Sequence, residues 1–334
     1  MFPSVLQELR KYFGRDFLLG VFFPVLIFIG TSLALYYEIT QGAEVALATW
    51  EKLSLQTQVF SILAGLIAVT VLAALIYNFQ YSLTRLFEGY WPRFRILSTL
   101  RNTRTRLYKE RWDYLEALTQ QSSTLTDAEK NEITEEQLIF YPPPIHLNRL
   151  MPTRIGNTLL ASEVYALDRY GIDSSIIWTR LRPLLTDKAV APLEDSRTAI
   201  DFMLLMSVFA ATFTLIWCPV LALFTNQWGL FLLCALGWPL AWICYQNAVQ
   251  RALDYSEQLK AIFDLYRHDL LKVLGRPIPT SAKAEHKEWR ELSDFLYYNV
   301  PMPSPPTAPE KPQDWSQVAT ALAELLKRMS PPIP

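Results

Sequence analysis

The chain has 334 residues, a net charge of −1, 51% hydrophobic residues and only 19% charged residues. Soluble domains carry roughly 25% charged residues, so this balance favours a membrane protein, although composition alone does not decide the class. The three cysteines, Cys218, Cys234 and Cys244, all fall in apolar runs, which excludes a disulfide framework in loops outside a membrane.

Four runs of the chain contain no Asp, Glu, Lys, Arg or His, and they cover residues 17–37, 59–77, 202–223 and 229–245. A helix needs about 20 mainly apolar residues to cross roughly 30 Å of hydrocarbon, and it satisfies its own backbone groups there. The chain is therefore predicted to be an all-α membrane protein with four transmembrane helices, at 17–37, 59–78, 200–223 and 229–249. The first run is too long for a signal peptide and ends at a poor cleavage site, so we expect it to be retained.

The charges that flank these runs predict the orientation of the chain, because cationic side chains mark cytoplasmic flanks. The N-terminal segment, 1–16, carries Arg10, Lys11 and Arg15. The loop 38–58 carries one lysine against three glutamates, and the turn 224–228 is uncharged. We therefore expect the loop and the turn outside and both chain ends in the cytoplasm, an N-in/C-in topology.

Residues 79–199 are predicted to form a helical cytoplasmic domain. Its first part, 80–121, has an apolar face typical of a long helix that continues the second span, with a kink at Pro92. Cations dominate this stretch: Arg85, Arg93, Arg95, Arg101, Arg104, Arg106, Lys109 and Arg111. They are interpreted as an anchor over anionic headgroups or as a cationic vestibule that concentrates anions below a pore. Nucleic-acid binding is disfavoured, because no recognisable motif accompanies the charges.

The most patterned segment follows a capped helix start at Thr126 and the proline run 142–144. Residues 151–157 lead into a helix that Gly171 is predicted to end, and Asp173 or Ser174 should cap a second, short helix. Polar and aromatic side chains recur here: Arg154, Asn157, Glu163, Arg169, Tyr170, Trp178 and Arg180. Three hypotheses apply to them: a polar network that fixes both helices against the membrane domain, a pocket that senses a small molecule or nucleotide, or a catalytic centre.

Part of this segment has a resemblance elsewhere. Pro-Thr-Arg-Ile-Gly-Asn at 152–157, Glu163, Arg-Tyr-Gly-Ile-Asp at 169–173 and Trp-Thr-Arg-Leu at 178–181 together resemble an element of bacterial multi-spanning inner-membrane proteins of unassigned function. The resemblance covers about 30 residues. It implies a bacterial inner (plasma) membrane and no activity, while the flanking charges predict that most of the non-membrane mass lies in the cytoplasm.

The C-terminal third is predicted to return to the cytoplasm. Residues 250–300 should hold helices, of which the first extends the fourth span and another covers 285–298. A Pro-rich linker, 301–312, and an amphipathic helix with its tail, 313–334, follow. This last helix is expected to dock on its own or a neighbouring subunit, or to lie on the membrane surface.

The sequence contains no motif for a metal, a cofactor or a catalytic nucleophile, so an enzyme is disfavoured and no cofactor is expected. The spans have no ionisable residue in their interiors, which disfavours ion-coupled transport; Asp201, at the entrance to the third span, is expected to stay hydrated. The leading hypothesis is an oligomeric channel or pore-forming protein that its cytoplasmic domain gates or regulates. Its expected partners are the bilayer, further copies of the chain, and a cytoplasmic protein or small-molecule regulator. The alternative is a membrane-anchored scaffold or signalling component that binds cytoplasmic partners, and a lipid-modifying enzyme is third.

Overall fold

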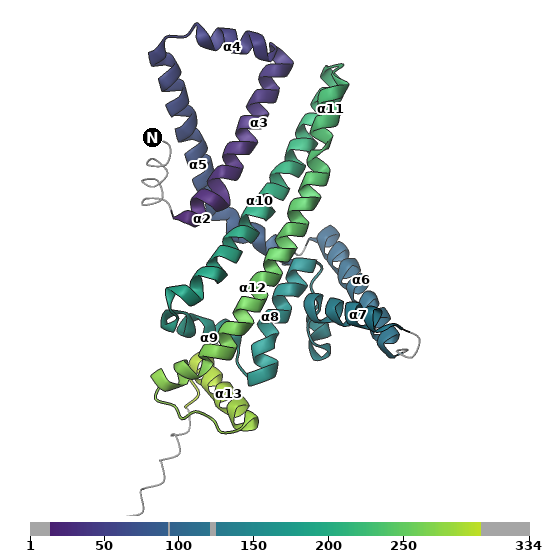
Figure 1. Ribbon diagram of the computed structural model, residues 1–334, viewed down its shortest axis with the longest axis vertical. Coiled ribbons are helices and arrows are strands. Elements are labelled where there is room, and N and C mark those ends of the chain that lie inside the picture. The colour runs from purple at the N-terminus through teal and green to yellow at the C-terminus, as the bar shows by residue number, and fades with distance from the viewer. Residues whose placement is uncertain (1–13, 93, 121–124, 302–334) are drawn as a thin grey trace, which may run out of the picture.

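The computed structural model describes residues 14–92, 94–120 and 125–301. Every regular element in these ranges is helical, and four helical segments are long and apolar enough to cross a membrane (Figure 1). The first comprises a π-helical turn, Leu18–Phe22, and α3, Phe23–Thr40, after the short α2, Arg15–Phe17. The others are α5, Leu55–Glu88, then α10, Asp187–Phe224, and finally α11 with α12, Trp228–Ala235 and Gly237–Val273. The prediction of an all-helical chain with four apolar spans is thus confirmed.

The pair α10 and α12 forms the long axis of the molecule (Figure 1). Small and hydroxylated side chains lie between the two helices and allow them to approach closely. Gly237 faces Thr214 and the carbonyl of Ala210 so tightly that a β-carbon would overlap them. The Ser207 hydroxyl donates to the carbonyl of Ala241 at 2.8 Å. These contacts join the two helices along their apolar stretches.

The helices α3 and α5 diverge from their lower ends, and α4, Ala43–Glu51, bridges them at the top (Figure 1). Only 11% of the most apolar stretch of α5 is buried within the molecule, against 39% for the first span. The side chains of Phe60 and Ile67 are 73% and 63% exposed. Most of α5 therefore faces lipid or another protein rather than its own chain.

One predicted helix is wrong in detail. The expected helix over 80–121, kinked at Pro92, is instead two helices: α5 ends at Glu88, and α6, Arg95–Gln120, begins after a break. Gly89 ends α5 in the left-handed region with φ 104°, where glycine is tolerated without strain. The third apolar run lies within a longer helix, since α10 is continuous from Asp187 through Pro192 into the run.

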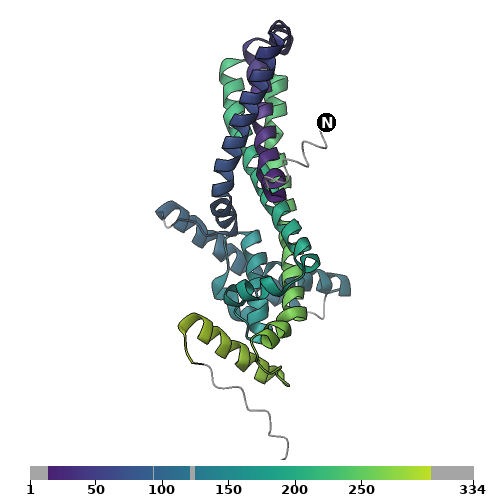
Figure 2. The ribbon, with the colours of Figure 1, turned by 90° about the vertical axis from the view of Figure 1, so that its left-hand side faces the viewer.

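Below the spans lies a helical body made of α8, Arg154–Tyr170, α9, Ser174–Leu181, α13, Ala282–Tyr298, and the lower halves of α10 and α12 (Figures 1 and 2). A short 3-10 turn, Arg182–Leu184, joins α9 to α10. The core contains Ile172, Ile177, Leu181, Phe263 and Trp289, each fully buried. As predicted, Gly171 ends α8 with φ 78°, and Asp173 caps α9 by accepting the N–H of Ser175 at 3.0 Å.

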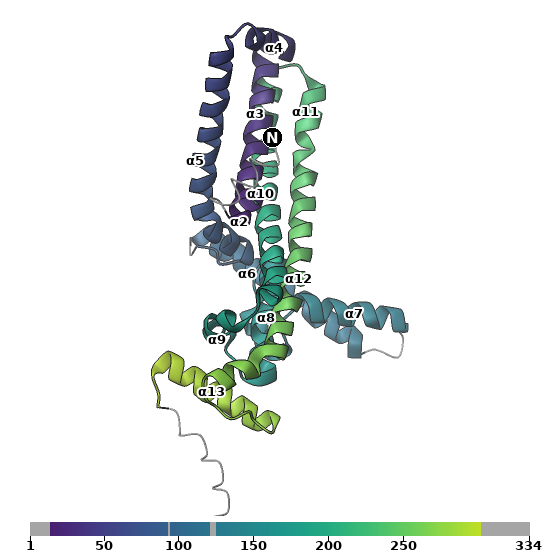
Figure 3. The same ribbon diagram turned by 60° about the vertical axis from the view of Figure 1, so that its left-hand side comes forward.

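The helices α6 and α7, Asp127–Phe140, form an arm that projects sideways from the body (Figure 3). Trp112 and Leu115 of α6 pack against Tyr141 and Leu150, and a 3-10 turn, Pro144–Arg149, leads back towards α8. Thr126 and Glu129 form the predicted capping box of α7. Arg93, most of the predicted linker 301–312 and the predicted amphipathic helix with its tail, 313–334, lie outside the described residues.

Candidate functional site

The centre of the molecule is a joint between the lower end of α5 and the start of α8. A β-carbon on Gly156 would overlap the carbonyl oxygen of Glu88, and one on Gly89 would lie 2.5 Å from Cδ of Pro152. The two backbones therefore touch without an intervening side chain. We call this contact the α5–α8 joint.

Asn157 holds the backbone turn that leads into this joint. Its side chain is fully buried, accepts the N–H of Met151 at 2.7 Å and donates to the carbonyl of Met151 at 3.1 Å. Thr153 caps α8 by accepting the N–H of Gly156 at 3.0 Å. A buried amide that satisfies one residue's donor and acceptor together acts structurally, because no polar atom remains for a ligand.

Beside the joint, charged side chains of α5 and α10 pack together. Arg197 lies 4.0 Å from Glu88 and 3.6 Å from Asp201, and the Thr84 hydroxyl donates to Asp201 at 2.9 Å. Asp201, expected to stay hydrated, retains only 17% of its side-chain exposure. Burying these groups is tolerated because each carboxylate has a cationic or hydroxyl partner.

A cavity of about 270 Å³ opens next to Glu88 and Arg197, and Glu163 and Trp178 also line it. It is slightly smaller than the roughly 300–1,000 Å³ of sites that enclose drug-sized ligands. Two of the residues expected in a sensing pocket therefore do meet at one cavity. Glu163, however, is already bound to Arg149 at 2.7 Å.

The lower part of α8 carries a second polar cluster, built on Asp264 of α12. The hydroxyls of Tyr170 and Tyr165 both donate to its carboxylate, at 2.7 Å and 3.0 Å, and Arg169 donates to the Tyr165 hydroxyl at 3.0 Å. Burial and the bond to Asp264 raise the pKa of Tyr170 to about 12. The phenol thus stays protonated near neutral pH, and the cluster ties α8 to α12.

The structure distributes the seven predicted residues over several separate contacts. Arg154 stacks on the ring of Phe140, with its guanidinium 3.8 Å from the ring centroid. Arg180 is exposed and donates to the carbonyl of Ile176 at 2.8 Å within its own helix. Arg169 and Tyr170 share the Asp264 cluster, Glu163 and Trp178 share the cavity, and Asn157 holds the turn.

Sequence reasoning missed the partners that organise these contacts. Asp264 and Arg197 lie where long helices extend beyond their apolar stretches, and there a charged residue looks like an ordinary solvated one. Asp264 lies 94 positions from Tyr170, and Asp201 lies 117 positions from Thr84. No local spacing rule links residues so far apart, so no sequence signal marked them.

The predicted basic residues lie on two helices. Arg85 belongs to α5, and its guanidinium stacks 3.5 Å above the centroid of the Tyr90 ring. Arg95, Arg101, Arg104 and Arg106 belong to α6 in the arm. Of these six cations, Arg106 pairs with Glu110 at 3.2 Å and Arg85 with Glu88 at 3.7 Å, while Arg93 is outside the described part of the chain.

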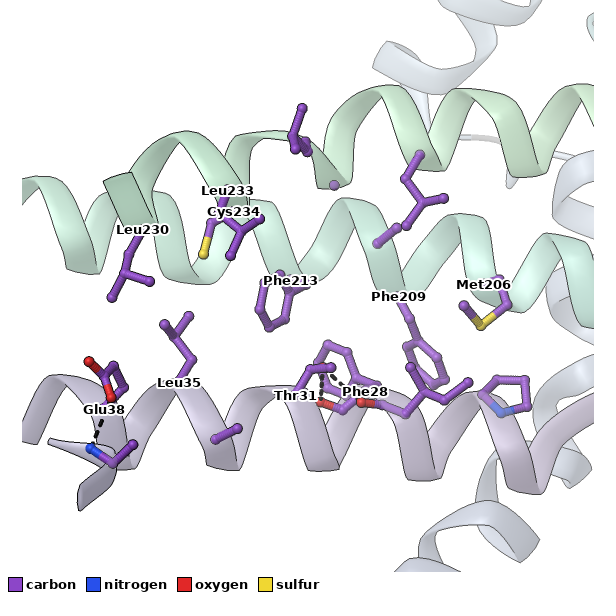
Figure 4. A pocket seen from close by; sticks show the side chains of 18 residues that line it. Phe28, Thr31, Leu35, Glu38, Met206, Phe209, Phe213, Leu230, Leu233 and Cys234 are labelled. Carbon is purple, nitrogen blue, oxygen red and sulfur yellow. Dashed lines mark hydrogen bonds between the residues drawn. The ribbon is translucent and has the colours of Figure 1, made fainter. Parts of the chain in front are cut away.

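Within the spans, an apolar groove of about 760 Å³ is lined by α3, α10 and α11, which also contact one another beside it. Figure 4 shows Phe28 of α3 beside Phe209 of α10, on which its ring stacks with centroids 4.8 Å apart, and Leu35 on the side of Phe213 and Leu230. The polar groups at its edge are used locally: Thr31 donates to the carbonyl of Ile27 at 2.7 Å, and Glu38 accepts the N–H of Ala43 at 2.9 Å. The groove therefore offers only apolar contact, which suits hydrocarbon chains.

The ion pairs that attach α13 to α12 predict that the stability of this attachment depends on pH. Burial opposes ionisation of Glu285, but bonds from Arg267 and His268, both 2.8 Å, hold its pKa below the ordinary value. A carboxyl with a lowered native pKa contributes stability above its ordinary pKa and loses it as the pH falls through the native value. We therefore expect α13 to loosen below about pH 4.

The variant Glu285→Gln should cost about 1.5 kcal/mol at neutral pH and flatten this acid transition. Its unfolding temperature, followed from pH 7 down to pH 3, measures both effects. Glu291→Gln is the control, because Glu291 only meets Lys287 on the surface at 3.7 Å. If both variants kept the wild-type pH profile, Glu285 would not be the titrating group.

Comparisons with known proteins assign no role to these contacts. Within the described ranges, His, Cys, Asp and Glu side chains form no group of three that could hold a metal ion. No protein-family model matches the chain, and neither a curated protein nor a solved structure is found to be similar to it.

Proposed function

We propose that the protein is a membrane-anchored scaffold or signalling component, in which the spans anchor the chain and the helical body binds a cytoplasmic partner. The main support for this proposal is the way in which hydroxyl groups in the spans are hydrogen-bonded. Thr31 and Thr70 donate to carbonyls of their own helices at 2.7 Å and 2.8 Å. Ser207 of α10 donates to Ala241 of α12 at 2.8 Å, and Thr214 of α10 donates to Cys234 of α11 at 2.9 Å. Each of these donors is used within the chain, so these four hydroxyls have only acceptor lone pairs left to offer to an aqueous path.

The same proposal explains why the body is continuous with the spans. Both α10 and α12 run without interruption from the apolar region into the body, and the α5–α8 joint adds a third rigid link. Regular helices with buried contacts hold their relative positions. A partner that binds the body would thereby be held at a fixed place beneath the membrane, in an N-in/C-in orientation at a bacterial inner membrane.

The second candidate is the oligomeric channel, and the exposure of α5 favours it. Because α5 buries only 11% of its most apolar stretch and diverges from α3, a path would have to form between copies of the chain. In such an assembly α5 would lie at the subunit contact. Lipid alone can also cover an apolar helix at little cost, which is why this observation ranks second.

Particle symmetry and solute flux distinguish the two candidates. We expect purified protein in lipid nanodiscs to form monomers or packed dimers, and reconstituted liposomes to pass neither ions nor a small dye. Rings of five or more copies with an axial opening, together with flux, would establish the channel and overturn the scaffold. The variant Thr70→Val is the matched probe, because it alters flux only if α5 lines a path.

Orientation is tested separately, in intact cells. Cysteines introduced at Thr179, on the exposed side of α9, and at Thr49, in α4, report opposite sides of the membrane. In intact cells an impermeant maleimide should label Thr49→Cys and spare Thr179→Cys. The reverse pattern would place the body outside and refute a cytoplasmic partner.

A further inference from the structure

A basic pocket of about 510 Å³ lies between α6 and the segments that form the α5–α8 joint. Three cations of α6 line it, Arg101, Arg106 and Lys109, together with the polar side chains of Asn102 and Thr105. These five positions recur at spacings of three and four, so they occupy one face of the helix. The opposite wall is formed by Gly89 and Tyr90 and by residues that precede α8.

The charge of this pocket is not balanced within the described part of the chain. Arg106 has one surface partner, Glu110, at 3.2 Å, while Arg101 and Lys109 have no carboxylate within 4.0 Å among the described residues. No acidic side chain lines the pocket. Like charges three to four residues apart on a helix repel one another, so an anion bound between them would stabilise α6.

The position of the pocket indicates where such an anion comes from. The start of α6 lies just below the level of α2, at the lower ends of the spans (Figure 1). In this first turn Phe94 and Ile96 are 70% and 83% exposed, beside Arg95. Exposed apolar side chains among cations are typical of a helix that lies in the headgroup region of a membrane.

We propose that the basic pocket binds a phosphate group, and that this group belongs to an anionic phospholipid of the adjoining leaflet. Arginine guanidinium groups offer several N–H donors to phosphate oxygens, lysine adds a point charge, and the hydroxyl and amide of Thr105 and Asn102 complete the donor set. The volume exceeds that of phosphate alone and leaves room for a headgroup substituent. This site is independent of the proposed function, since a scaffold and a channel would both carry it.

The full-length protein in neutral detergent allows the test, with short-chain phosphatidylglycerol, short-chain phosphatidylcholine and inorganic phosphate as separate probes. The pocket variant is Arg101→Gln/Lys109→Gln. The matched control is Arg95→Gln/Arg104→Gln, which removes the same charge from the same helix outside the pocket. Binding is followed by the shift of the unfolding temperature and by lipid retained in native mass spectrometry.

We expect the wild type and the control to bind phosphatidylglycerol, and the pocket variant to bind it at least tenfold more weakly. Binding of phosphatidylglycerol that inorganic phosphate does not displace identifies the lipid as the source. Binding of inorganic phosphate in competition with the lipid identifies a soluble phosphate compound instead, at the same pocket. Equal losses in the two double variants, or equal affinity for phosphatidylcholine, would overturn the site, because general charge or lipid packing would then account for binding.

Discussion

Replacing Gly156 by alanine is expected to lower the free energy of unfolding by about 3 kcal/mol. The added methyl group would overlap the carbonyl oxygen of Glu88, which is backbone and cannot rotate away as a side chain would. Either α8 or the end of α5 must shift, and this shift would also disturb the turn that Asn157 holds. A glycine-to-alanine change in an unhindered helix stabilises by roughly 0.5–1 kcal/mol, so the sign of the effect reports the clash.

The native cysteines provide the measurement. Cys234 and Cys244 are buried in the described structure, so a thiol-reactive dye reports their exposure as the protein unfolds on heating. Gly65→Ala is the matched control, because Gly65 lies in α5 with no atom within 4 Å of an added β-carbon. We expect Gly156→Ala to unfold at a clearly lower temperature and Gly65→Ala to match or exceed the wild type. Wild-type stability in Gly156→Ala would mean that α5 and α8 do not touch.

Replacing Trp289 by alanine is expected to cost about 3–5 kcal/mol and to release α13 from the body. The indole is fully buried against the core that includes Ile172, Phe263 and Leu271. Its loss would leave a large cavity that the surrounding helices cannot close, because α8 and α12 are held by the Asp264 cluster. Released α13 should become accessible to protease within its own residues, 282–298, which are helical and packed on the body when Trp289 is in place.

Two variants isolate the contribution of packing at this position. Trp289→Phe retains an aromatic ring, and the indole Nε1 has no hydrogen-bond partner among the described residues, so this change should cost distinctly less than alanine. Tyr297→Ala, on the same helix with 67% of Tyr297 exposed, should leave unfolding and proteolysis nearly unchanged. If Tyr297→Ala were as damaging as Trp289→Ala, α13 would pack through its other face.

The polar residues of α8 illustrate the difference between composition and arrangement. Their recurrence at 154, 157, 163, 169 and 170 predicted one network or one pocket. The structure directs them to different neighbours instead: Phe140 of the arm, the turn at Met151, Arg149, and the Asp264 cluster of α12. Helix periodicity gives the face on which a residue lies, but the element that meets each face depends on how distant helices pack.

The sequence by itself determined the features that depend on local physics. Charge-free runs identified the four spans. Hydrocarbon excludes ionised groups, and this exclusion does not depend on how the rest of the chain folds. Capping residues identified helix ends at Thr126, Gly171 and Asp173, because each cap acts on the backbone within a few residues.

Four features became evident only in the tertiary structure. They are the break of the expected long helix at Gly89, the α5–α8 joint, the burial of Asp201 and the basic pocket. Gly89 and Gly156 are each compatible with several local conformations. Their roles follow from contacts with Pro152 and Glu88, more than 60 positions away along the chain. Contacts between segments so far apart arise from the packing of whole helices, and no local pattern in the sequence records which helices meet.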